Sequence, residues 1–149
     1  MTPSIAHVQA LSSLPHGPEF RFVDELLELE PGVSAHGKFV LQADTEMMRG
    51  HFPGAPMLPG VIMVEALAQL GGVLVQTRPD KAPLADIRLT AIQRFKILRS
   101  AVPGDEIHLF AKLDHVMGGL AQISGEVHGP GGVLLAAGTV MLSGTIVAG

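Results

Sequence analysis

The chain has 149 residues, a net charge of −4 and a sequence pI of about 5.9. This acidic balance argues against a nucleic-acid-binding protein, and the lack of cysteine excludes disulfides, thiolate nucleophiles and cysteine metal sites. Hydrophobic residues make up 47% and charged residues only 16%, so we expect another subunit to cover part of the surface.

The length predicts one domain over residues 1–149. The N-terminal segment lacks the basic and apolar regions of a signal peptide. The best apolar run, Val61 to Val75, is shorter than the roughly 20 residues that a membrane span needs. We therefore expect a cytoplasmic protein without a membrane span.

The first third of the chain predicts a short helix, two strands and a helical turn. Ile5, Val8 and Leu11 follow helical spacing, which predicts a helix over about 4–14 that ends before a proline. Residues 20–29 and 33–41 predict two strands joined by a Pro-Gly turn. Residues 44–48 predict one helical turn with Asp44 as its cap.

The rest of the chain predicts one long helix followed by strands. Residues 59–76 predict a helix, and Pro59 suits its first turn. Between Val61 and Val75 this helix is apolar on every side apart from two positions, which indicates that it is buried. Strands are expected around 87–98, 107–113, 121–128 and 133–143, with glycine-rich connections. The simplest arrangement is an α+β fold in which an antiparallel sheet of about six strands wraps round the central helix.

The two polar positions of this helix are Glu65 and Gln69, which lie one turn apart on one face. Burying a carboxylate is costly unless it is hydrogen-bonded, paired or protonated. A carboxyl that stays protonated near neutral pH can act as a general acid. The alternative is that Glu65 reaches a surface edge or a subunit seam and makes a structural hydrogen bond.

His51 precedes the helix in a segment, 50–60, that is rich in proline and glycine. A lone histidine is more often structural than catalytic, so its setting carries the argument. The first helical N–H groups, near Gly60 and Val61, have no intrahelical acceptor and suit a carbonyl oxygen that gains negative charge. A base (His51), an acid (Glu65) and the Gly60 amide meet the needs of proton abstraction beside a thioester carbonyl and loss of a β-hydroxyl.

The stretch 50–72 closely resembles the bacterial 3-hydroxyacyl-[acyl-carrier-protein] dehydratases of the FabZ type. Their signature is present as Gly50-His51-Phe52-Pro53, Pro56-Met57-Leu58-Pro59-Gly60 and Glu65-Ala66-Leu67-Ala68-Gln69. Weaker agreement extends over most of the chain and includes Leu14-Pro15-His16.

The resemblance implies a hot-dog fold and conversion of a (3R)-3-hydroxyacyl thioester on acyl carrier protein to the trans-2-enoyl thioester, in fatty-acid or related lipid or polyketide biosynthesis. It implies that His51 acts on the C2 proton and that Glu65 comes from the neighbouring subunit of a dimer. The Gly60 amide would hold the thioester oxygen, and Gln69 would help place a water or the acid. Phe52 and Val61 complete the expected substrate-binding set. The acyl chain would lie in a tunnel along the interface between the two subunits of the dimer. Many members of the family are trimers of dimers. No cofactor or metal is expected.

Acyl carrier protein is acidic, so a basic patch near the tunnel mouth is expected. Arg94, Lys96 and Arg99 lie on one segment, and Arg94 and Lys96 would share a strand face by the two-residue period. The alternative is an ordinary solvated strand face. The family often has Pro-His-Arg-Tyr-Pro-Phe where this chain has Pro15-His16-Gly17-Pro18-Glu19-Phe20, which leaves open a side-pathway enzyme rather than the housekeeping one.

Two further functions stay open at this stage. A hot-dog thioesterase also uses a carboxylate and a helix N-terminus, but it would release a free acid. A catalytically inert hot-dog scaffold would only bind acyl chains or partners, and the presence of His51, Gly60 and Glu65 argues against it.

Overall fold

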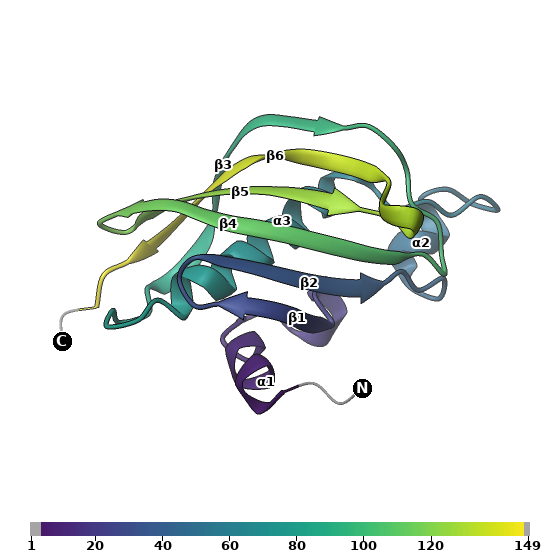
Figure 1. The fold of residues 1–149 in the computed structure, drawn as a ribbon. Coiled ribbons are helices and arrows are strands. Elements are labelled where there is room, and N and C mark those ends of the chain that lie inside the picture. The colour runs from purple at the N-terminus through teal and green to yellow at the C-terminus, as the bar shows by residue number, and fades with distance from the viewer. Residues whose placement is uncertain (1–3, 148–149) are drawn as a thin grey trace.

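A six-stranded antiparallel sheet curls around one long helix in the computed structural model, which describes residues 4–147 (Figure 1). The strands are β1 (Glu25–Glu30), β2 (Ser34–Val40), β3 (Ala85–Ile97), β4 (Glu106–Met117), β5 (Leu120–His128) and β6 (Leu134–Thr145), in the spatial order β1-β2-β4-β5-β6-β3. The helices are α1 (Ile5–Leu11), α2 (Glu46–Gly50) and α3 (Gly60–Gln76), with 3-10 turns at Pro18–Phe20 and Pro130–Gly132. The expected α+β architecture of a sheet wrapped round a central helix is confirmed.

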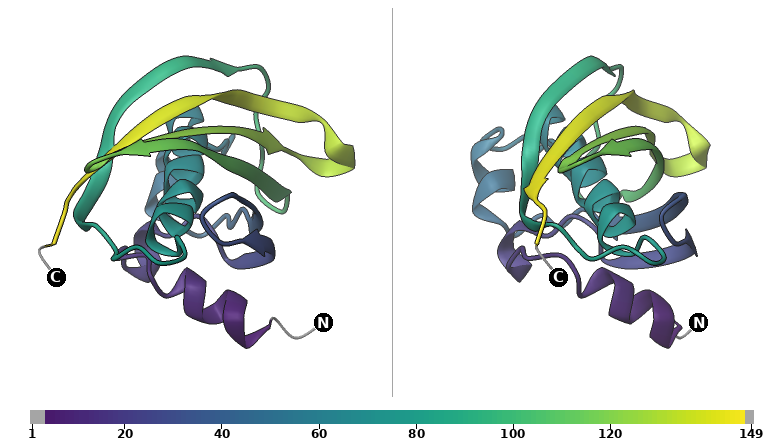
Figure 2. Two further views of the ribbon diagram at one scale, coloured as in Figure 1. Left: turned by 60° about the vertical axis from the view of Figure 1, so that its left-hand side comes forward. Right: turned by 90° about the vertical axis from the view of Figure 1, so that its left-hand side faces the viewer.

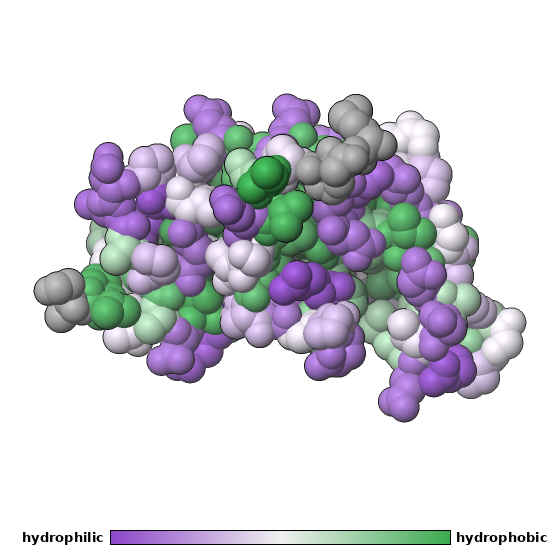
Figure 3. All heavy atoms as spheres, turned by 90° about the horizontal axis from the view of Figure 1, so that it is seen from below, coloured by the Kyte–Doolittle hydropathy of each residue, from purple (hydrophilic) through white to green (hydrophobic). Residues whose placement is uncertain are grey.

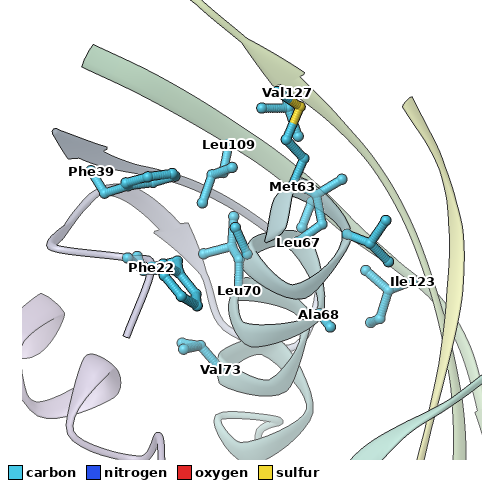
Figure 4. Packing of buried hydrophobic residues seen from close by; sticks show 14 of the residues in the cluster. Phe22, Phe39, Met63, Leu67, Ala68, Leu70, Val73, Leu109, Ile123 and Val127 are labelled. Carbon is cyan, nitrogen blue, oxygen red and sulfur yellow. The ribbon is translucent and has the colours of Figure 1, made fainter. Parts of the chain in front are cut away.

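The core lies between α3 and the concave side of the sheet, which arches over the helix (Figure 2). Figure 4 shows Met63, Leu67 and Leu70 of α3 directed toward side chains from the strands, among them Leu109 and Val127. Burying each such side chain stabilises the fold by about 1.5–3 kcal/mol. Close approach is needed at Gly71, because a Cβ there would lie 2.7 Å from the Ile123 side chain.

Strands β1 and β3 form the two edges of the sheet. Within residues 4–147, β3 pairs with β6 and β1 pairs with β2, so each keeps one unpaired side. Strand β3 also exposes apolar side chains, with Ile92 54% and Ile97 49% exposed. An unpaired strand edge with exposed apolar residues offers a surface that a second chain can cover.

Three local expectations differ from the structure in their bounds. Helix α1 begins after Ser4, which caps it, and ends at Leu11, because Ser12 already forms the C-cap. The strand expected from residue 20 begins at Glu25, since the backbone at Phe22 bonds to a side chain of α3 rather than to another strand. Helix α2 is capped by Thr45, whose hydroxyl accepts from the Met48 N–H at 3.2 Å, and not by Asp44.

The surface on the α1 side of the molecule mixes polar and apolar side chains (Figure 3). Ile5 of α1 is 78% exposed, so this short helix covers little of the core with its own apolar residues. No helix within residues 4–147 combines the length and the hydropathy needed to cross a membrane.

Candidate active site

His51 lies at the C-terminal end of α2, where the chain turns into the proline-rich loop. Its ring Nδ1 is 2.8 Å from the Met57 carbonyl oxygen, and the Met57 N–H donates to the His51 carbonyl at 2.7 Å. A carbonyl oxygen can only accept, so Nδ1 carries the hydrogen of the neutral ring. The other nitrogen, Nε2, therefore keeps a free lone pair and can accept a proton.

The start of α3 lies on the same loop. Pro59 occupies the N-cap, and the Ile62 N–H donates back to its carbonyl at 2.9 Å, while the amides of Gly60 and Val61 have no acceptor inside the helix. A Cβ on Gly60 would lie 2.7 Å from the Ile97 side chain, so the backbone here is packed tightly against the end of β3. Val61 is 70% exposed and Phe52, which stacks on the His51 ring, is 51% exposed. This half of the site is therefore open and apolar at its rim.

Glu65 and Gln69 form a hydrogen-bonded pair on α3. Gln69 Nε2 donates to Glu65 Oε2 at 3.1 Å and to the Phe20 carbonyl at 2.9 Å, and Gln69 Oε1 accepts from the Phe22 N–H at 2.8 Å. The Phe22 N–H must face an acceptor, so these partners fix which end of the amide points toward Glu65. Gln69 is only 1% exposed, and it ties the carboxyl to the segment before β1.

His16 is a second neighbour of the carboxyl, and no role for it was predicted from the sequence. Its Nε2 lies 3.5 Å from Glu65 Oε2, and its Nδ1 is buried without a partner in the described part of the chain. Arg21 Nη2 lies 3.3 Å from the His16 carbonyl and 3.4 Å from that of Leu14, and these two long hydrogen bonds hold the loop. The only indication in the sequence was that His16 belongs to the Leu14-Pro15-His16 segment, which agrees with the family pattern.

A cavity of about 390 Å³ opens beside Glu65. It runs along α3 toward Gln76 and is closed on its other sides by β3, β6 and the segment 13–20. Its apolar lining residues include Leu14, Ala68, Ile87, Leu89 and Leu142. The cavity has the size and the mixed lining of a small-molecule site, with a carboxyl at one end.

Within one chain the structure forms two half-sites. His51 lies in the loop before α3 together with Gly60, Val61 and Phe52, whereas Glu65, Gln69 and His16 line the cavity, and none of the first four lines it. Five residues of helix separate Gly60 from Glu65, which turns the two positions by roughly 140° about the axis. Base and acid thus belong to different surfaces of the same protomer.

The three basic residues of the expected carrier contact are all exposed. Arg94 and Lys96 lie on β3, and Arg99 follows its end. The expected two-residue alternation between Arg94 and Lys96 does not hold, because the pairing with β6 shifts between Gln93 and Lys96 and Arg94 has a left-handed φ of 52°. A bulge therefore determines how these side chains project.

Residues 4–147 contain no group of three or more His, Asp or Glu side chains arranged to hold a metal ion.

Comparison with known proteins gives a consistent family. The profile of the FabA-like domain family matches residues 14–147. A relative from Herpetosiphon aurantiacus, named 3-hydroxyacyl-[acyl-carrier-protein] dehydratase FabZ, is 36% identical over 132 residues, which cover 85% of this chain and 93% of the relative. A protein of the same name from Chloroflexus aggregans is 37% identical over 119 residues, which cover 80% of this chain and 81% of that protein.

Solved structures with a similar fold have much lower sequence identity. The dehydratase heterocomplex ApeI:P from Xenorhabdus doucetiae superposes with a TM-score of 0.72 at 17% identity and covers 91% of this chain and 90% of that chain. Zebrafish thioesterase superfamily member 2 superposes with a TM-score of 0.66 at 16% identity, covering 89% of this chain and 91% of its own. At these identities the likeness concerns the fold, and the hot-dog arrangement is common to dehydratases and thioesterases.

Proposed function

The chain belongs to the FabA-like family, and from this membership we propose how its residues work in a 3-hydroxyacyl-[acyl-carrier-protein] dehydratase of the FabZ type. The enzyme is a hydro-lyase of fatty-acid biosynthesis that removes water from a 3-hydroxyacyl thioester. The roles of individual residues, the assembly and the carrier contact are our proposals.

The observation that carries the mechanism is the hydrogen bond of His51 to the Met57 carbonyl. It fixes the hydrogen of the neutral ring on Nδ1, so Nε2 is the basic atom and removes a proton from C2 of the substrate. The electron pair of the broken C–H bond moves toward the thioester carbonyl, whose oxygen gains negative charge. We assign that oxygen to the amide of Gly60, with the neighbouring Val61 amide and the Phe52 ring bordering the same position.

Glu65 acts as the acid in the second step. Both contacts of its carboxyl in the described residues are made at Oε2, so the proton of the acid form is carried at Oε1. When the electron pair returns from the carbonyl to form the C2–C3 double bond, the C3–O bond breaks and the leaving hydroxyl takes this proton as water. The imidazolium then holds the C2 proton, and its transfer back to the carboxylate restores both groups for the next substrate. Gln69 and His16 hold the carboxyl in position.

We propose that the two half-sites meet across a homodimer, so that His51 of one copy faces Glu65 of the other. The separation of the two half-sites on one protomer and the unpaired, apolar edge of β3 support this arrangement. Dimers can associate further into a trimer of dimers. The acyl chain would occupy the cavity beside Glu65. The partner would be an acyl carrier protein in the cytoplasm, and we propose that it contacts Arg94, Lys96 and Arg99.

Product analysis of the purified protein tests this function. We expect 3-hydroxyacyl thioesters of several chain lengths to yield enoyl thioesters, seen by absorbance, with no free thiol. The reverse hydration should be observed with crotonyl or longer enoyl thioesters. Release of free thiol would instead identify a thioesterase, and an inert protein across the whole series would identify a binding scaffold.

A further inference from the structure

Three histidines form a cluster on the face of the sheet that points away from α3. His36 lies on β2, His108 on β4 and His128 on β5, and these strands are neighbours in the sheet. Their neighbours along each strand, such as Ala35 and Leu109, are buried on the helix side. The cluster is therefore separated from the Glu65 cavity by the thickness of the sheet, and the dehydratase mechanism does not use it.

The central contact joins two imidazoles across the seam between β2 and β4. His36 Nε2 lies 2.7 Å from His108 Nδ1, which is the distance of a hydrogen bond. The His36 ring also stacks on Phe110 with centroids 4.2 Å apart, and Phe110 lies 4.8 Å from the His128 ring. A nitrogen-to-nitrogen hydrogen bond needs one protonated and one unprotonated atom, so it exists only while at least one of the two rings is neutral.

Carboxylates stand at the outer side of each ring. Glu28 Oε1 of β1 lies 3.7 Å from His36 Nδ1, and Glu106 Oε1 lies 2.8 Å from His108 Nε2. The charged and titratable groups around the pair are completed by Glu126, 2.8 Å from His128, by Lys38, 3.9 Å from Glu106, and by Lys112, which lies two residues beyond Phe110 on the same face of β4. The second nitrogen of each ring of the pair thus faces a carboxylate.

Burial lowers the pKa of His36 from its ordinary value of 6.5, and the nearby His108 acts in the same direction, while Glu28 opposes them. The folded protein therefore disfavours the charged form of His36. For a histidine whose pKa is lowered on folding, its contribution to stability is complete above the unfolded value of 6.5 and is lost as the pH falls through the folded value.

We propose that the His36–His108 contact is a proton-sensitive clasp across the β2–β4 seam. With at least one neutral ring, the imidazoles bond to each other and hold β2 against β4. When both rings are protonated, the shared hydrogen bond is lost, the two positive charges repel, and each ring keeps only the contact with its own carboxylate, His36 with Glu28 and His108 with Glu106. The outer edge of the sheet, formed by β1 and β2, is then held less firmly.

A double-mutant cycle on unfolding tests the clasp, with His36→Gln and His108→Gln in the full chain at one fixed protomer concentration. At about pH 7.5 we expect the pair to favour the folded state by roughly threefold to tenfold in the unfolding equilibrium constant, the usual net strength of one neutral hydrogen bond. At a second pH, low enough to lie below the lowered folded pKa of His36, we expect this coupling to fall below one because the two rings then repel each other. A coupling that is the same at both pH values would overturn the proposal.

A matched cycle and a second measurement complete the test. Thr90 and Ser143 bond across β3 and β6 at 2.8 Å without a titrating group, so the cycle made with Thr90→Val and Ser143→Ala should give a coupling that does not change with pH. If the doubly substituted chain does not fold, ring NMR of the native chain and of the single variant His108→Gln replaces the cycle. The titration midpoint of His36 should rise when His108 is replaced, and an unchanged midpoint would overturn the clasp.

Discussion

The two half-sites of this enzyme are built in different ways. His51 is held by a residue six positions along the chain, through bonds between its ring and backbone and those of Met57. Glu65 is held by groups that come from far away in the sequence, because Gln69 links it to Phe20 and Phe22 and His16 lies beside it. His51 is therefore oriented by contacts within a short loop, whereas Glu65 is oriented by contacts with a distant part of the sequence.

The half-sites also differ in exposure. Phe52 and Val61 border the base and are 51% and 70% exposed, while the amide that positions the acid is 1% exposed. The exposed apolar rim beside His51 and the cavity that opens beside Glu65 could therefore fit against each other in a pair of chains. In the proposed dimer, this difference would let the rim around His51 of one protomer cover the cavity beside Glu65 of the other.

Removal of either catalytic side chain should have the largest effect. We expect His51→Ala and Glu65→Gln each to lower kcat by about 1,000-fold, within the range found for general acid–base groups. Replacement of His115, an exposed histidine of β4, by alanine serves as the control and should leave kcat within twofold of the native value, by the usual small effect of surface changes. Activity retained in either site variant would contradict the assigned roles.

Mixing the two inactive variants tests whether the half-sites come from different subunits. Co-expressed His51→Ala and Glu65→Gln chains should regain about one quarter of the native activity per site, because half of the randomly paired dimers are mixed and each mixed dimer holds one intact site. The measurement is the rate of enoyl thioester formation by the total purified mixture, without selection for mixed dimers. If one chain supplies the whole site, the mixture stays as inactive as its components.

Loss of the amide at position 69 should affect both stability and rate. Gln69→Leu leaves the buried Phe22 N–H without its acceptor, so we expect unfolding free energy to fall by about 2–3 kcal/mol. Glu65 also loses its donor, and we expect kcat to fall by about tenfold at a temperature where the variant is folded. Gln122→Leu removes an exposed amide bonded only to Asp114 in residues 4–147 and should change neither quantity appreciably. Equal stability of the two variants would show that the Gln69 bonds are not structural.

The smallest expected effect concerns the carrier protein. Charge reversal by Lys96→Glu or Arg99→Glu should raise KM for the carrier-linked substrate by about threefold to tenfold and leave a small thioester mimic unaffected, as rim charges usually act on association. Lys112→Glu, on the outer face of β4, is the charge-matched control. An equal loss on both substrates would assign these residues to the site itself rather than to carrier docking.

The contrast between local and distant contacts also explains which features of the structure could be predicted from the sequence and which could not. The long helix, the six strands and the loop of His51 follow from apolar period, glycine and proline, all of which are local signals. The sequence did not predict that His16 lies near Glu65, nor that β1 begins only at Glu25, because both depend on contacts to α3 from the segment before β1. The bulge at Arg94 was also missed, since a two-residue period carries no information about an inserted residue.

The separation of the two half-sites along α3 also affects how the gene can diverge after duplication. If two copies of the gene arose, one product could lose its imidazole and the other its carboxyl, and a pair of unlike chains would still hold one working centre. The second site of such a pair, which lacks both side chains, would no longer be under selection for catalysis and could evolve to bind another ligand. If the sites form between two chains as proposed, each chain is thus already suited to become one member of an unequal pair.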